Sequence, residues 1–155
     1  MTPAVRDLDA AGIGYVVHDY EHRADRRDFG REAADELGID PDRVFKTLLV
    51  TVDDGQAVAI VPVSGSAALK AVGRALGSKR AEMCDPVVAE RVTGYVVGGI
   101  SPFGQKKRLP TVIDEIALAF DTIFVSGGRR GVDIEVAPSD LIDHLGAVVA
   151  DIAIG

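Results

Sequence analysis

The stretch "VFKTLLVTVDDGQAVAIVPV", residues 44–63, carries the strongest structural signal in the chain. Two runs rich in apolar and β-branched residues flank an Asp-Asp-Gly turn at residues 53–55. This pattern predicts an antiparallel hairpin with buried strands. Lys46 interrupts the first run, and strand alternation puts it on the same face as Leu48 and Val50.

An ammonium group on an apolar strand face needs either solvent or a partner for its charge. The spacing leaves two interpretations of Lys46 open. Its side chain extends to water at the end of the strand, or it holds a carbonyl, carboxylate or phosphate oxygen of a ligand. Burial would also lower the pKa of Lys46, which suits a general base.

Short helices and short strands alternate along the rest of the chain. We expect helices over residues 2–12, 29–39, 66–78, 138–146 and within 82–94, where the helix begins near Asp85. We expect strands over residues 13–20, 94–100, 111–116, 121–128, 132–138 and 147–154. Many short strands with glycine turns and two hairpins predict an α+β fold, a mixed, strongly bent sheet or small barrel with peripheral helices. A doubly wound parallel sheet fits less well.

The composition is that of an ordinary globular protein, with 47% hydrophobic and 26% charged residues. A length of 155 residues suits one domain, residues 1–155, with a proper core. No apolar run reaches the roughly 20 residues of a membrane span. The first residues lack the basic start and apolar stretch of a signal peptide, so we expect a cytoplasmic protein with no membrane partner.

Neither a disulfide nor a metal site is expected. Cys84 is the only cysteine, and the three histidines show no metal-binding spacing. Cys84 precedes a helix start, which favours a reactive thiol, but a lone cysteine is more often a small buried hydrophobe. The net charge of −7 argues against broad nucleic-acid binding, DNA included, and leaves room for a local basic patch.

A glycine-rich loop occupies "GYVVGGISPFGQKKRLP", residues 94–110. Gly98 and Gly99 allow a ligand to approach the backbone, whose N–H groups bind oxyanions. A plain turn is the alternative. The densest basic cluster follows at Lys106, Lys107 and Arg108. It is either a solvated turn or a contact to a phosphate backbone.

A second glycine-rich segment is "VSGGRRGVDIEV", residues 125–136, which also holds the basic pair Arg129 and Arg130. A hairpin explains its glycines. It does not explain Ser126 and Asp133, which we expect to form a polar pair on facing strands. Elsewhere, Tyr20 in "HDYEH" either lines a pocket or lies at a surface edge.

Three blocks together resemble the YbaK family of aminoacyl-tRNA deacylases, most of all its bacterial Cys-tRNA(Pro) deacylase branch. They are "FGREAADELGIDPDRVFKTLLV", "TGYVVGGISPFGQKKRLPTVID" and "FVSGGRRGVDIEVAPSDL". The combination of V-F-K-T-L, G-Y-V-x-G-G-x-S-P-x-G-x-K-K and S-G-G-x-R-G is specific, and the resemblance spans nearly the whole chain. It implies the fold of the editing domain found in some prolyl-tRNA synthetases.

The resemblance implies a trans-editing enzyme that cleaves the ester of mischarged Cys-tRNA(Pro). Such editing is needed because an apolar synthetase pocket discriminates poorly between amino acids of similar size. The implied mechanism is substrate-assisted, in which the cysteine thiol attacks its own ester carbonyl and the protein positions it. No metal or organic cofactor is implied, and the residues suggest no protein nucleophile.

Several residues of this chain match functional positions of the family. Lys46 matches its essential lysine, and Gly99 matches the glycine whose backbone faces the carbonyl. Four further positions match the substrate pocket: Tyr20 and Phe29 as walls, and Ser126 and Asp133 as polar orienting groups.

The resemblance also implies a tRNA contact. We expect it at Lys106, Lys107, Arg108, Arg129 and Arg130. With a net charge of −7 this contact is weak alone, so a ternary complex with prolyl-tRNA synthetase would supply specificity for tRNA(Pro). Two alternatives stay open: a related deacylase for another amino acid such as alanine, and a tRNA- or synthetase-binding module without catalysis.

Overall fold

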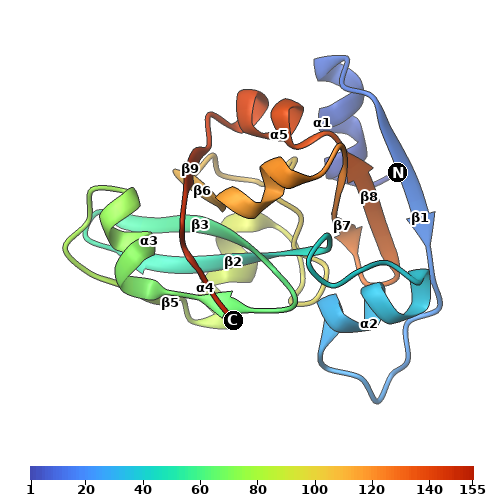
Figure 1. Cartoon of the computed structure of the whole chain (residues 1–155), viewed down its shortest axis with the longest axis horizontal. Coiled ribbons are helices and arrows are strands. Elements are labelled where there is room, and N and C mark those ends of the chain that lie inside the picture. Colours follow the sequence, from blue (N-terminus) through green and yellow to red (C-terminus); the bar gives the residue numbers. More distant parts are fainter.

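A computed structural model describes all 155 residues as five α-helices, one 3₁₀ helix and ten strands (Figure 1). The helices are α1 (Pro3–Ala11), α2 (Phe29–Leu37), α3 (Leu69–Ala75), α4 (Pro86–Thr93), the 3₁₀ helix η1 (Glu115–Ala119) and α5 (Pro138–Leu145). The strands are β1 (Tyr15–Asp19), β2 (Phe45–Val52), β3 (Gly55–Pro62), β4 (Ser66–Ala67), β5 (Ala81–Met83), β6 (Thr111–Asp114), β7 (Ile123–Arg129), β8 (Val132–Val136), β9 (Val148–Ala150) and β10 (Ala153–Ile154).

The predicted hairpin forms the centre of a five-stranded mixed sheet with the order β5-β2-β3-β6-β9. β2 and β3 pair antiparallel over their whole length, with Lys46 opposite Val61. β6 pairs parallel to β3, and β9 pairs parallel to β6. The prediction of a central antiparallel hairpin in a mixed sheet is confirmed.

A second, antiparallel sheet of order β1-β8-β7 lies beside the first. One parallel bridge, between Val44 and Phe124, connects the two sheets just before β2 begins. β10 and β4 form a separate two-stranded ribbon. The sheets form no closed barrel, so the α+β class with mixed sheets and peripheral helices is confirmed and the small-barrel alternative is wrong.

The core is divided over both faces of the five-stranded sheet. Phe45 and Leu49 of β2 pack in the largest cluster, which includes Ile134 of the second sheet and Leu141 of α5. On the other face, Val50 packs with residues of β3 and α3. α2 covers the junction between the sheets, as Figure 1 shows. Apolar burial of this kind holds the two sheets in a fixed relation.

Residues 94–100 do not form the predicted strand. Gly94 caps α4 with a φ of 79°, and Gly98 has a φ of 89°, both in the left-handed region that glycine favours. The buried Tyr95 hydroxyl donates to the carbonyl oxygen of Phe103 at 2.6 Å. The segment is therefore a loop anchored by Tyr95, whereas the neighbouring Val96 is exposed.

Two smaller expectations also fail. The predicted strand over residues 147–154 is interrupted, because a carboxylate oxygen of Asp114 accepts the backbone N–H groups of Ile152 and Ala153, each at 2.9 Å. The predicted helix start at Ser66 is wrong, because that residue pairs with Ile154 in the small ribbon and α3 begins at Leu69.

Candidate active site

The site is built around an open stretch of the edge of β2. On one side β2 is paired throughout with β3. On the other side, β5 pairs with Val50–Val52, and the N–H of Cys84, just after β5, donates to the carbonyl oxygen of Leu49 at 3.0 Å. From there to the bridge at Val44, residues 45–48 have no neighbouring strand at that edge. An unpaired strand edge offers backbone hydrogen-bonding groups as well as side chains.

A cavity of about 420 Å³ lies against this open edge. That size is in the range of pockets for small ligands. The loop before α2, the start of α4, the loop at residues 97–100 and the second sheet complete its wall. The residues that matter most to its chemistry are Tyr20, Arg27, Asp28, Phe29, Arg31, Lys46, Thr47, Cys84, Gly98, Ser126 and Asp133.

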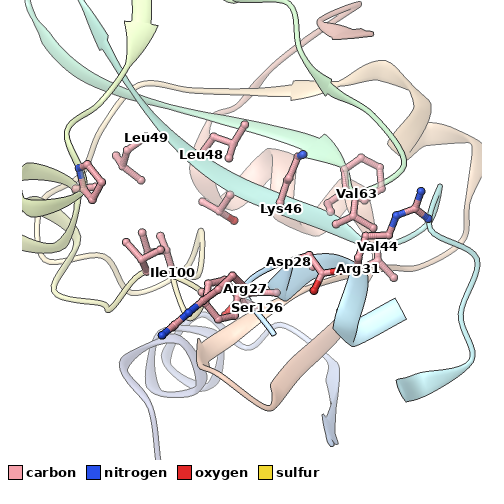
Figure 2. A pocket seen from close by; sticks show the side chains of 18 of the residues that line it. Arg27, Asp28, Arg31, Val44, Lys46, Leu48, Leu49, Val63, Ile100 and Ser126 are labelled. Atoms are coloured by element: carbon pink, nitrogen blue, oxygen red, sulfur yellow. The ribbon is translucent and has the colours of Figure 1, made fainter. Parts of the chain in front are cut away.

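Lys46 lies in this cavity, on the face of β2 predicted from the sequence. Its side chain is half-buried and projects from β2 between Leu48 and Val63 (Figure 2). The ammonium group forms no salt bridge and no side-chain hydrogen bond within the chain. Burial, with a smaller effect from the positive charge of Arg31, lowers the pKa of Lys46. An unpaired cation in an apolar cavity is suited to a developing negative charge.

Phe29 forms one wall of the cavity and depends on Gly98. A Cβ atom at Gly98 would lie 2.7 Å from the Phe29 ring, so the ring rests on the bare backbone of the loop. The Arg130 guanidinium lies over the ring, 4.7 Å from its centroid, and donates to the carbonyl oxygen of Val97 at 2.9 Å. These contacts fix Phe29 between α2 and the glycine-rich loop.

Buried Glu32 holds the loop that carries Tyr20. Its carboxylate forms a hydrogen bond with Nδ1 of His22 at 2.6 Å and accepts one from the backbone N–H of Arg23 at 2.8 Å. The Tyr20 backbone N–H donates to the carbonyl oxygen of Gly131 at 2.9 Å. Tyr20 therefore lines the cavity as a fixed wall, although β1 ends one residue before it.

Ser126 and Asp133 face each other across β7 and β8, as predicted. Both line the cavity, and Asp133 is only 5% exposed. Burial raises the pKa of Asp133 to about 7. Burial, followed by the charge of Asp133, raises the pKa of Tyr20 to about 12. Tyr20, Ser126 and Asp133 therefore give the cavity wall a polar region in which no group has an ionic partner.

Gly99, unlike Gly98, is not among the residues that line the cavity. Its N–H already donates to the carbonyl oxygen of Val96 at 2.8 Å. A Cβ atom at this position would lie 2.7 Å from the Arg129 backbone. The structure therefore gives Gly99 a packing function, and its predicted contact with a carbonyl stays a prediction.

The five predicted tRNA-binding residues divide into two groups. Arg129 and Arg130 lie beside the glycine-rich loop, and Arg130 is engaged with Phe29. Lys107 and Arg108 line a second, smaller cavity next to the turn between β2 and β3. Lys106 lies in the loop that follows α4. Its backbone N–H donates to the carbonyl oxygen of Thr93, the last residue of α4.

Thr47, Arg27 and Arg31 are the cavity residues that sequence reasoning missed. The Thr47 hydroxyl is the only buried side-chain polar atom in the chain without a hydrogen-bond partner. The one feature of the sequence that could have indicated Thr47 as a cavity residue is its position directly after Lys46 in the same strand. Arg27 and Arg31 stand in a run of alternating charges that reads as a solvated helix start. Cys84 is buried and lines the cavity, which answers where its thiol lies.

The chain contains no group of three or more His, Cys, Asp or Glu side chains arranged to hold a metal ion. No helix has the length and apolar character needed to cross a membrane.

Comparison with known proteins identifies the family. The aminoacyl-tRNA editing domain matches residues 25–144, which contain most of the cavity wall. The chain belongs to this family. A relative from Enterococcus faecalis (strain ATCC 700802 / V583) is 36% identical over 153 residues, which cover 97% of this chain and 92% of the relative's length. That relative is provisionally named Cys-tRNA(Pro)/Cys-tRNA(Cys) deacylase EbsC.

Two solved structures share the fold. One is described as a candidate trans-editing enzyme for prolyl tRNA synthetase, with a TM-score of 0.86, 24% identity and coverage of 100% of this chain and 99% of that chain. The other is the hypothetical protein APE2540, with a TM-score of 0.88, 24% identity and coverage of 98% and 99%. The editing-domain fold expected from the sequence is confirmed.

Proposed function

We propose that this editing domain is a deacylase that hydrolyses the aminoacyl ester of mischarged Cys-tRNA(Pro). The unpaired, half-buried Lys46 in an apolar cavity carries the proposal, because it provides a cation where an ester carbonyl gains negative charge. The provisional name of the enterococcal relative supports cysteine as the amino acid.

The ester reaction needs stabilisation of an oxyanion and a nucleophile. Lys46 would stabilise the oxyanion electrostatically, and its half-buried position strengthens this interaction relative to bulk water. No histidine lines the cavity, so it holds no Ser-His or Cys-His pair that could activate a protein nucleophile. The nucleophile therefore comes from the substrate or from water.

The substrate's own thiol fits the requirement. Its sulfur forms a bond to the carbonyl carbon, the bond from that carbon to the ribose oxygen breaks, and the thiol proton ends on the ribose oxygen. Water then opens the small cyclic thioester. Such an intramolecular step gains from being held in the reactive geometry, which is what a fixed cavity supplies.

The rest of the cavity would select and orient the aminoacyl group. Tyr20 and Phe29 are held as rigid walls, which limits the size of the side chain that enters. Ser126 and Asp133 would orient its polar end, since both are cavity residues without an ionic partner. Gly99 would act through the position of the loop.

The predicted tRNA contacts remain part of the proposal. Lys106, Lys107, Arg108, Arg129 and Arg130 would contact the acceptor end of tRNA(Pro). Since the chain has a net charge of −7, we propose that prolyl-tRNA synthetase forms a ternary complex that supplies the remaining specificity.

Hydrolysis of Cys-tRNA(Pro), Ser-tRNA(Pro) and Ala-tRNA(Pro), side by side, tests the function. The Lys46→Ala variant is the site test, and Lys70→Ala, an exposed lysine of α3, is the matched control. We expect loss of the cysteinyl ester only, abolished in Lys46→Ala alone. Equal cleavage of the seryl ester would indicate attack by water, and faster cleavage of the alanyl ester would indicate a deacylase for another amino acid. Cleavage of none would indicate a binding module.

A further inference from the structure

Three cationic side chains without partners surround the cavity. Arg27 and Arg31 line it together with Lys46. None of the three takes part in the seven salt bridges of the chain. They form no side-chain hydrogen bond either. All three line the same cavity, in a chain whose net charge is −7.

Arg26, a neighbour in sequence, shows what a structural arginine looks like here. Two of its nitrogens donate to the Asp28 carboxylate at 2.8 and 2.6 Å, and it also reaches Asp35 at 3.2 Å. These contacts lower the pKa of Asp28, the one carboxylate between the two free arginines. Arg26 therefore largely compensates Asp28, which leaves Arg27 and Arg31 as arginines of the cavity wall without a bonded carboxylate.

The two free arginines lie at the entrance of the cavity, whereas the unpaired carboxylate Asp133 is buried. Arg27 and Arg31 are both exposed. Figure 2 shows their guanidinium groups on different sides of the cavity, Arg27 towards Ile100 and Arg31 beside Val44 and Val63. Mutual repulsion between cations at one site is unfavourable unless an anion joins them.

We propose that Arg27 and Arg31 bind the backbone phosphates next to the 3′-terminal nucleotide of the substrate. This inference rests on the proposed function, since an ester carbonyl at Lys46 places the terminal ribose at the entrance. The nearest phosphates are then one and two sugars away from the carbonyl. Guanidinium groups bind phosphate oxygens through two parallel hydrogen bonds, and neither of these two arginines is bonded to a carboxylate of the chain.

The inference adds a positioning site to the tRNA contacts proposed above. Phosphate contacts fix register without reading sequence. Arg27 and Arg31 would therefore hold the end of any aminoacylated strand in the cavity, and Lys106, Lys107 and Arg108 would contact the strand farther from the ester.

Esters that differ only in their phosphates provide the test. We would compare cysteinyl-adenosine, which has no phosphate, with the cysteinyl ester of the trinucleotide CpCpA, which has two. The proteins are wild type, Arg27→Gln, Arg31→Gln and, as a charge-matched control, Lys70→Gln. Binding of uncharged CpCpA, measured as a function of salt concentration, is the second readout.

Each arginine variant should lower kcat/KM for the CpCpA ester about 5- to 10-fold and leave the adenosine ester within about 2-fold. The salt dependence of CpCpA binding should weaken by about 0.7 in log–log slope per arginine. Lys70→Gln should change neither. Equal losses on both esters, or no loss on either, would overturn the assignment of a phosphate site.

The two proposals can fail separately. If wild type cleaves neither ester, the deacylase function fails, and the CpCpA titration still decides the phosphate site. Unchanged CpCpA affinity and salt slope in both arginine variants would then overturn it. A reduced slope in those variants alone would support it without catalysis.

Discussion

Strands β2 and β8 join a region of paired charges to a region of unpaired ones. Arg43, just before β2, donates to the carbonyl oxygen of Thr122 at 2.8 Å and to Glu135 of β8 at 3.3 Å. His18 bonds with the same glutamate at 2.9 Å. Three residues after Arg43, Lys46 has no partner.

The two carboxylates of β8 repeat the contrast. Hydrogen bonds from Thr122 and His18 hold the pKa of Glu135 below its usual range, whereas burial raises the pKa of Asp133 to about 7. The paired groups stabilise the fold. The unpaired groups lie in a cavity with no partner in the chain, and ionisable groups of this kind cluster at sites that bind a ligand.

Loss of the Lys46 ammonium should have the largest effect on the reaction. Lys46→Ala removes the half-buried cation that we place at the carbonyl oxyanion, and we expect kcat to fall about 10²- to 10³-fold. Its free energy of unfolding should stay the same or rise, because no salt bridge is lost. Single-turnover hydrolysis of Cys-tRNA(Pro) and urea unfolding measure the two quantities. If Lys46→Ala lost as much stability as Arg43→Ala, the contrast between a paired Arg43 and an unpaired Lys46 would be wrong.

Asp133→Asn should change the pH dependence of stability. The folded protein binds the Asp133 proton more tightly than the unfolded chain does, because the pKa is raised to about 7. Stability from this residue is therefore complete below pH ~4 and is lost as the pH rises to about 7. At neutral pH we expect Asp133→Asn to be about 2–3 kcal/mol more stable than wild type, less than the full shift implies because the cavity admits water.

Urea unfolding at pH 5, 6, 7 and 8 measures this effect. The gap between Asp133→Asn and wild type should widen with pH. Glu135→Gln is the matched control on the same strand, and it should be destabilised at neutral pH, since the pKa of Glu135 is lowered. Parallel pH curves for wild type and Asp133→Asn would show that the carboxylate is not buried as described.

Arg43→Ala should show the opposite profile to Lys46→Ala. It removes hydrogen bonds to Thr122 and Glu135 and the stacking of a guanidinium 5.2 Å from the centroid of Phe124. We expect a loss of about 1–3 kcal/mol in the free energy of unfolding and ester cleavage within about 2-fold of wild type. Thermal unfolding and the deacylation assay check this. A large catalytic loss at unchanged stability would place Arg43 in the site instead.

The sequence was informative where one local rule decided the structure. The hairpin, the position of Lys46 on its face and the pairing of Ser126 with Asp133 follow from strand alternation and turn composition. Residues 94–100 form a loop instead of the expected strand, because two left-handed glycines and the hydrogen bond from Tyr95 to Phe103 determine its path. Local pattern does not reveal such tertiary contacts.

The cavity itself was harder to predict than its individual residues. It exists because β5 stops short of Lys46 along β2, which depends on pairing across the chain. Arg26 and Arg27 look alike in sequence, and only their contacts separate a paired arginine from a free one. The family resemblance supplied Phe29, which no pattern in the chain distinguishes, and it decided between the two interpretations of Tyr20.

Thr47→Val should give the smallest effect, and Thr93→Val is its matched partner. The Thr93 hydroxyl donates to the carbonyl oxygen of Ala89 at 2.7 Å and accepts the N–H of Tyr95 at 3.2 Å. Its loss should cost about 1–2 kcal/mol, since buried partners are left unsatisfied. The Thr47 hydroxyl has no partner to abandon, so Thr47→Val should change stability by less than about 0.5 kcal/mol. If chemical unfolding instead showed equal losses for both variants, the Thr47 hydroxyl would be bonded in solution. The open edge of β2 would then be less free than the cavity beside Lys46 requires.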